Sequence, residues 1–178
     1  MNPFLFHPAK KRGFWFIIKY MLETTQLKIL NSSSIDELRK SFNQFTNKKL
    51  KLFDLDLVIF PEDFDHCCYE YLEGAVYKGK FSLRRARRML LIEQICNNEV
   101  GFKVLYQNER ENKSLIIISE IAEFCFIVLP VNSKAKIYLR LLTMVAFGRG
   151  VEGGMGRFIK KAKEINREEL LKLIKERK

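Results

Sequence analysis

The stretch GFKVLYQNERENKSLIIISEIAEFCFIVLPVNSKAKIYLRLLTMVAF, residues 101–147, decides the fold. It contains four runs rich in β-branched and aromatic residues, which read GFKVLYQ, SLIIIS, EFCFIVLPV and KIYLRLLTMVAF. Residues of these types favour β-strands. The connections NEREN, EIA and NSKA are too short for the crossovers that parallel strands require. The stretch therefore predicts a four-stranded antiparallel meander.

An amphipathic helix is predicted well before this meander. Ser34 and Glu37 have the spacing of a capping box, in which each side chain accepts from the other residue's backbone amide. Apolar residues then recur at helical spacing from Ile35 to Phe45.

Three more elements follow before the meander begins. Residues 48–60 alternate between apolar and polar side chains and predict a single strand. Pro61 ends that strand and suits the first turn of a short helix over residues 61–72. Ser82 then precedes the strong helical pattern LRRARRMLLIEQIC, residues 83–96.

This order of helices followed by strands predicts an α+β fold, with the helices packed on one face of the meander. We divide the chain into an N-terminal segment of uncertain role, residues 1–30, and an α+β domain, residues 31–147. Residues 148–156 are expected to be a Gly-rich linker, and residues 157–178 a basic amphipathic C-terminal helix. Within the N-terminal segment, the beginning of the sequence fits either an amphipathic surface segment or the product of an upstream start codon.

The composition indicates a partner that is acidic. Lysine and arginine number 32 against 21 acidic residues, which gives a net charge of +11 and a pI of about 9.6. Nucleic acid is the leading candidate, although such charge also serves solubility alone. No apolar run approaches the roughly 18 residues of a membrane span. The four cysteines do not form a disulfide framework. We expect a cytoplasmic protein without membrane contact.

Two motifs are weaker than they first look. Gly148, Gly150 and Gly153 match a dinucleotide-binding pattern, but no second strand with a terminal acidic residue follows, so a hinge is the better interpretation. In IFPEDFDHCCYE, residues 59–70, His66 precedes two cysteines. Three consecutive helical residues point about 100° apart and cannot share one ion, so we predict no metal and no cofactor.

His66 is then either an acid–base group or a structural residue. The last strand offers possible partners, because Lys136, Tyr138 and Arg140 alternate onto one face. Such a face suits a phosphate, although a solvated sheet face is an equal alternative. Regular alternation puts Thr143 on the opposite face, and only a bulge would unite it with Arg140. The candidates for contacts with flanking phosphates are Lys78, Lys80, Arg84, Arg85, Arg87, Arg88, Lys103 and Lys136.

The segments FDHCCYE, GKFSLRRARRMLLIEQICNN and AKIYLRLLTMVAF resemble phage-associated members of the barnase–EndoU–colicin–RelE class of small ribonucleases. The resemblance covers about residues 50–147 and rests on loose motifs. It implies that an early helix supplies His66 and that the sheet supplies Arg140 and Thr143, with assistance from Tyr138. The chain departs from several members of the class because its sheet has no histidine.

The resulting hypothesis is a metal-independent endoribonuclease that cleaves RNA by attack of the 2′-hydroxyl, of a mobile-element or toxin type. A toxin of this kind implies a protein inhibitor, expected to be acidic. The first alternative is a non-catalytic module that binds RNA or DNA through the same basic residues. The second is an assembly protein of a mobile element that docks through its C-terminal helix.

Overall fold

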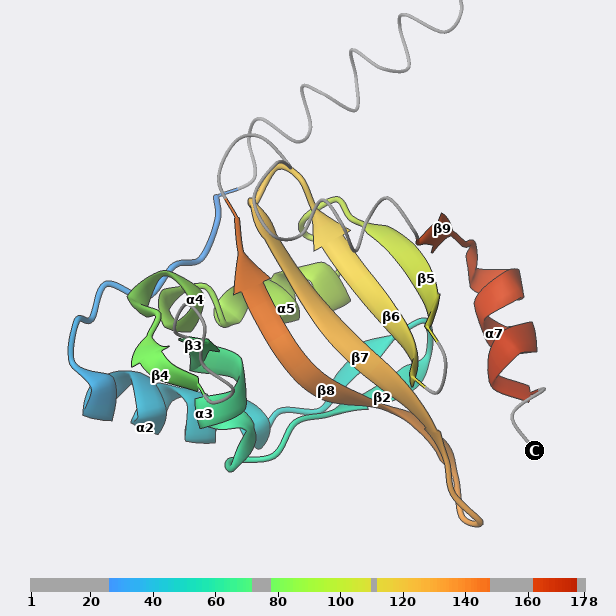
Figure 1. Cartoon of the computed structure of the whole chain (residues 1–178), viewed down its shortest axis with the longest axis horizontal. Coiled ribbons are helices and arrows are strands. Elements are labelled where there is room, and N and C mark those ends of the chain that lie inside the picture. The colour runs from blue at the N-terminus through green and yellow to red at the C-terminus, as the bar shows by residue number, and fades with distance from the viewer. Residues whose placement is uncertain (1–25, 72–77, 110–111, 148–161, 176–178) are drawn as a thin grey trace, which may run out of the picture.

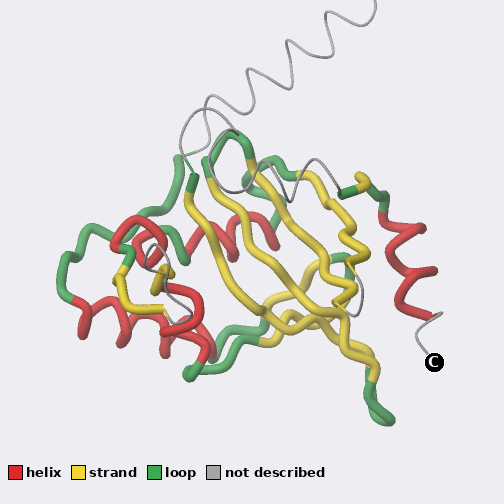
Figure 2. Tube along the Cα trace, viewed as in Figure 1, coloured by secondary structure: helices red, strands yellow, loops and turns green. Residues whose placement is uncertain are grey.

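The computed structural model describes residues 26–71, 78–109, 112–147 and 162–175, so the Gly-rich residues 148–156 lie outside the described part (Figures 1 and 2). The helices are α2 (Ile35–Thr46), α3 (Asp63–Cys68), α4 (Leu83–Arg87), α5 (Leu90–Cys96) and α7 (Arg167–Lys175). The strands are β1 (Leu50–Leu52), β2 (Leu55–Val58), β3 (Tyr69–Tyr71), β4 (Lys78–Phe81), β5 (Lys103–Glu109), β6 (Asn112–Ser119), β7 (Phe124–Asn132), β8 (Ile137–Ala146) and β9 (Lys163–Glu164).

Seven strands form one mixed sheet in the order β1-β2-β8-β7-β6-β5-β9, while β3 and β4 make a separate hairpin. Strands β5 to β8 pair consecutively and antiparallel. Strand β2 lies parallel to β8. The chain thus combines helices with a mostly antiparallel sheet, but this sheet is larger than the predicted four strands because β1, β2 and β9 extend its two edges.

The single strand predicted over residues 48–60 is a hairpin. Leu52 pairs with Leu55, and the two residues between them, Phe53 and Asp54, have φ of 54° and 66°. Positive φ at both central residues fits a type I′ turn, whose twist matches that of the flanking strands. The leucines change from even to odd positions at this turn, so a straight strand would place them on opposite faces. The turn returns both sets to the core: Leu50, Leu52, Leu57 and Ile59 are buried.

Two predicted helices are interrupted. The helix predicted over residues 61–72 ends at Cys68, where the chain becomes extended and pairs with β4. The helix predicted over residues 83–96 divides into α4 and α5. In one continuous helix Ala86 and Leu91 would point about 140° apart. Both side chains are fully buried. The break between α4 and α5 allows both of them to reach the core.

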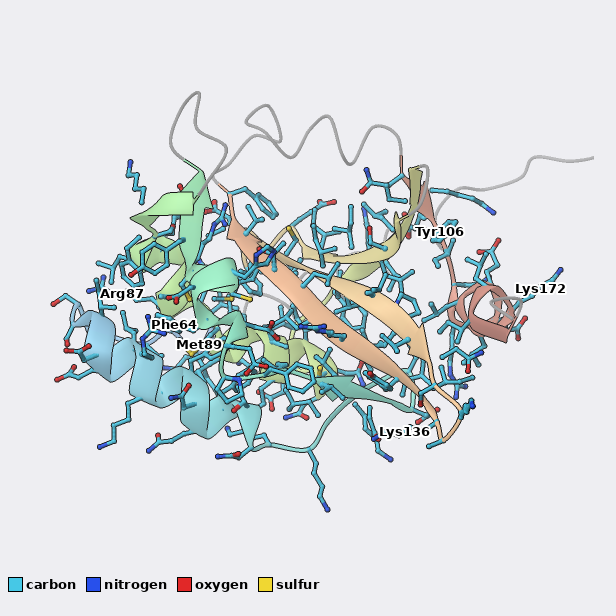
Figure 3. All side chains as sticks on the ribbon, turned by 60° about the horizontal axis from the view of Figure 1, so that its bottom comes forward. Phe64, Arg87, Met89, Tyr106, Lys136 and Lys172 are labelled. Atoms are coloured by element: carbon cyan, nitrogen blue, oxygen red, sulfur yellow. The ribbon has the colours of Figure 1, made fainter. Side chains whose placement is uncertain are left out.

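The main core lies between the helices and one face of the sheet. Figure 1 shows α5 behind the sheet, and its Ile92 belongs to the same buried cluster as Ile117 of β6. Aromatic rings join α2 to α3, with the Phe42 and Phe64 centroids 5.4 Å apart. Phe64 and Met89, both labelled in Figure 3, are fully buried members of this cluster. The largest fully buried rings are Phe42, Phe45, Phe64, Phe124 and Phe126.

The C-terminal segment is part of this core. Ile165, Leu170 and Ile174 are only 6%, 1% and 2% exposed and belong to the main buried cluster. The Ile165 amide also donates to the Val104 carbonyl at 3.0 Å, beside the pairing of β9 with β5. This packing differs from the separate basic helix expected over residues 157–178, because the apolar stripe of the helix is used internally.

Candidate functional site

A β-bulge on β8 brings Arg140 and Thr143 to the same face of the sheet. Thr143 pairs with Ile127, while Leu141 pairs with the next residue of β7, so Leu142 is the extra residue. Such an insertion shifts the alternation of side chains by one position. Arg140 and Thr143 therefore both lie on the face opposite the main core. The sequence predicts that the two residues share a face only if the strand contains a bulge.

Helix α3 borders this face from the side of β2. Strand β2 pairs with β8 as far as Val58 opposite Arg140, and α3 then runs beside the following part of β8 (Figure 1). The Thr143 hydroxyl donates to the His66 carbonyl at 3.2 Å. His66 is exposed, and it lies three residues after Asp63 on the same side of the helix. The bulge and the last turn of α3 are therefore joined directly.

The guanidinium of Arg140 has an unusually loose set of partners. Its Nη2 lies 3.5 Å from Asp63 Oδ1, and its side chain is 43% exposed. A charge-assisted hydrogen bond is normally about 2.7–2.9 Å long. The guanidinium also lies over the Phe60 ring, 5.1 Å from its centroid, and its Nε is buried without a hydrogen-bond partner, as are those of Arg85 and Arg88, so only its exposed Nη groups can reach an anion. Arg140 therefore retains donors with which to bind an anion.

Asp63 and Phe60 are members of this cluster that sequence reasoning missed. Asp63 Oδ2 accepts the Phe60 amide at 3.0 Å, and the Phe60 carbonyl accepts the Asp63 amide at 3.0 Å. The Asp63 side chain is only 10% exposed. The sequence shows the acidic first turn after Pro61. It does not show that Arg140 lies beside this turn, because that proximity comes from the distant pairing of β2 with β8.

Tyr138 and Lys136 continue the polar face of β8. Tyr138 lies beside Asp56 of β2, two residues before Arg140. Lys136 Nζ is 3.2 Å from Asp56 Oδ2 and 5.8 Å from the centroid of the Tyr138 ring. The predicted face of Lys136, Tyr138 and Arg140 is therefore present, and the carboxylate of Asp56 lies on it as well.

The arginines of α4, proposed as contacts for flanking phosphates, bond to neighbouring segments of the chain. Arg84 donates to the Glu123 carboxylate at 2.9 Å and also to the Phe147 carbonyl. Arg87 Nε donates to the Ser32 carbonyl at 2.8 Å. These bonds tie the helix to the segment that precedes α2 and to Phe147, the residue after β8.

The two remaining arginines are also held internally. Arg85 is 15% exposed, and its Nε lies 3.1 Å from a Glu70 carboxylate oxygen. Arg88 donates to the Arg84 carbonyl at 3.4 Å, and burial, aided by the nearby Arg84 charge, lowers its pKa. Neighbouring carbonyl and carboxylate groups thus contact all four arginines, and their contact with the phosphates of a nucleic acid stays a prediction.

The other candidate lysines lie apart from the bulge. Lys80 is exposed on β4, opposite Glu70, and Lys78 begins the same strand. Lys103 lies on the same sheet face as Arg140, but it donates to Glu120 at 3.1 Å, and this hydrogen bond raises its pKa. No contact found among the described residues joins Lys80 or Lys103 to the bulge cluster.

The cysteines are structural. Cys67, Cys68 and Cys125 are buried. Burial raises the pKa of Cys96 and of Cys125 to about 12, so neither thiol ionises near neutral pH. Within the described ranges, no three His, Cys, Asp or Glu side chains converge as metal ligands would.

The helices among the described residues are all too short or too polar to cross a lipid bilayer. Comparison with known proteins finds no matching family model, no similar curated protein and no similar solved structure. The functional argument therefore depends on the residues around the bulge.

Proposed function

We propose that the protein is a metal-independent endoribonuclease whose active site lies at the bulge of β8. The observation that carries this proposal is the insertion of Leu142, which puts Arg140 and Thr143 on one face beside the helix that bears His66. Histidine is the side chain best suited to proton transfer near neutral pH. An arginine with unused donors is suited to bind the phosphate.

In the proposed reaction, the ribose 2′-oxygen attacks the adjacent phosphorus, and the bond from phosphorus to the 5′-oxygen breaks. A base removes the proton of the 2′-hydroxyl, and an acid supplies a proton to the leaving 5′-oxygen. The products are a 2′,3′-cyclic phosphate and a free 5′-hydroxyl, so no external oxidant or nucleophile is required.

The residues divide these tasks by position. His66 acts as the base or the acid, because it is exposed beside the bulge. Arg140 stabilises the charge that develops on the phosphoryl oxygens. Tyr138, on the same face as Arg140, is our candidate for the second proton-transfer group, since the sheet has no histidine.

Asp63 acts as a positioning residue in this scheme. Its carboxylate is fixed by the Phe60 amide and faces Arg140 from 3.5 Å, which limits the directions in which the guanidinium points. A tighter ion pair would compete with a phosphate for the same donors, whereas this longer contact leaves them available.

Replacement of His66 tests the proposal. A labelled single-stranded RNA should be cleaved by the wild type in EDTA to a product that ends in a 2′,3′-cyclic phosphate. His66→Ala should slow cleavage by about 10²–10⁴-fold. Because the side chain is exposed, the change in the free energy of unfolding should stay within about 0.5 kcal/mol.

Glu62→Ala is the matched control, because Glu62 is exposed at the opposite end of the same helix and its side chain makes no capping hydrogen bond. It should leave the rate unchanged. RNA with 2′-O-methyl groups should resist the wild type, since the attacking hydroxyl is blocked. A wild-type protein that binds RNA but cuts none of a broad substrate panel would refute the enzyme and leave a nucleic-acid-binding module.

A further inference from the structure

The hairpin formed by β7 and β8 extends beyond the rest of the sheet (Figure 1). These two strands pair as far as Asn132 opposite Ile137, whereas the pairing of β6 with β7 ends at Val128. On the other side, the pairing of β2 with β8 begins only at Tyr138. We call residues 131–138 the hairpin arm. Its tip is a two-stranded projection. Among the described pairings, neither of its outer edges has a neighbouring strand.

The turn at the tip is held by Ser133. Its hydroxyl donates to the Lys136 carbonyl at 2.8 Å and accepts the Lys136 amide at 3.1 Å. The Ser133 amide donates to the same carbonyl at 3.1 Å. These three bonds fix the backbone, so the exposed side chains of Lys134 and Lys136 start from a defined turn rather than a loose loop.

Basic side chains surround the base of the arm as well. Lys51 of β1 is exposed and lies opposite Asp56, which in turn lies opposite Tyr138, so all three share the face of Arg140. Figure 3 shows Lys136 well apart from Arg87. Lys136 is 57% exposed although it pairs with Asp56 at 3.2 Å, so the arm carries positive charge at the surface, apart from the arginines of α4.

The spacing along β8 suits an extended nucleic-acid strand. Alternate residues of a strand are about 6.6 Å apart, a step comparable to one nucleotide. Lys136, Tyr138 and Arg140 therefore offer a cation, an aromatic ring and a second cation in sequence. Proteins that bind single strands combine cationic grooves with aromatic rings on which bases stack.

We propose that the hairpin arm binds the single-stranded RNA that flanks the cleavage site, with phosphates at Lys134, Lys136 and Lys51. This inference rests on the proposed function, because the proposed cleavage site at Arg140 sets the path of the RNA. The RNA strand would lead from the tip of the arm to Arg140. The bound substrate is then an unpaired strand several nucleotides long rather than a dinucleotide.

The test compares two double variants of the full chain. Lys134→Gln with Lys136→Gln removes the arm charges, and Lys40→Gln with Lys172→Gln removes two exposed lysines from helices elsewhere. Binding is measured by fluorescence anisotropy with a labelled 2′-O-methyl RNA, which the enzyme cannot cut. Thermal melts should match the wild type for both, since all four lysines are exposed.

The arm variant should bind about tenfold more weakly at low salt, and its slope of log K against log salt should fall by about 1.4, because each lost contact with a single-stranded phosphate contributes about 0.7. The control should keep the wild-type slope. Equal slopes for the two variants would overturn the arm while leaving cleavage at the bulge intact. If the wild type neither binds nor cleaves RNA, the proposed function fails and the arm fails with it.

Discussion

Arg84 on α4 and Arg140 on β8 are almost equally exposed, at 45% and 43% of their side chains, yet their surroundings differ. Arg84 forms a 2.9 Å bond to Glu123 and a second bond to a backbone carbonyl. Arg140 has one carboxylate at 3.5 Å and an aromatic ring beneath it. Exposure alone therefore does not identify an arginine that is available to a ligand, whereas the list of its partners does.

The C-terminal helix extends this comparison. The sequence marked two basic helical regions as surfaces for a partner, and the structure uses both internally. In α4 the guanidinium groups bond to neighbouring segments, and in α7 the apolar stripe packs into the core. The strand β8 carries fewer charges, but they are placed around a bulge and a projecting hairpin.

The largest expected effect concerns α7. A chain that ends at Phe147 should lose cooperative thermal unfolding, because it lacks three side chains that are buried in the main core. Each large apolar side chain contributes about 1.5–3 kcal/mol on burial, against a total stability of about 5–15 kcal/mol. Circular dichroism melts of the truncated and full chains give the measurement.

A single substitution separates packing from the loss of chain length. Leu170→Ala should reduce the free energy of unfolding by about 2–5 kcal/mol, since Leu170 is 1% exposed. Glu168→Ala, exposed in the first turn of the same helix, should change it by about 0.5 kcal/mol. If the truncated chain melts as cooperatively as the full one, α7 is a detachable element and the comparison with α4 does not apply to it.

The next effect distinguishes the two arginines directly. Arg140→Ala should reduce RNA cleavage by about 10²–10³-fold, because it removes charge stabilisation in the transition state. Arg84→Ala should leave the cleavage rate within about threefold and instead lower stability by about 1 kcal/mol through its lost hydrogen bonds. Single-turnover cleavage and urea unfolding of both variants give the two measurements.

Equal exposure makes this pair a fair control for net charge, since each substitution removes one positive charge from a similarly accessible position. A result in which both variants lose cleavage to the same degree would show that overall charge, rather than the geometry at the bulge, supports activity.

Much of the sheet was predictable because its signals are local. Dense β-branched residues with short connections predicted strands over residues 101–147, and the capping pattern at Ser34 predicted α2, whose Ser34 hydroxyl accepts the Glu37 amide in the structure. The change of leucine positions from even to odd around Phe53 was also present in the sequence. It signals a two-residue turn, and the single-strand prediction overlooked it.

The site was less predictable because its geometry comes from distant pairings. The parallel pairing of β2 with β8 places Phe60 and Asp63 beside Arg140, and no local pattern specifies that register. The bulge at Leu142 is likewise set by the partner strand. Apart from the Arg84 carbonyl to which Arg88 donates, the partners of the α4 arginines come from residues 15 to 63 positions away, which a single sequence does not connect.

The smallest expected effect concerns Thr143, the residue that the bulge moves to the face of Arg140. Thr143→Val preserves the shape of the side chain and removes the hydroxyl that donates to the His66 carbonyl. Stability should fall by about 0.5–1.5 kcal/mol, and cleavage should fall about three- to tenfold because the last turn of α3 is held less firmly. Thr143→Ser should restore both quantities, since serine keeps the donor. A loss of cleavage as large as that of Arg140→Ala, with stability unchanged, would instead show that the Thr143 hydroxyl contacts the reacting phosphate. In that case the residue belongs to the reaction itself rather than to the support of His66.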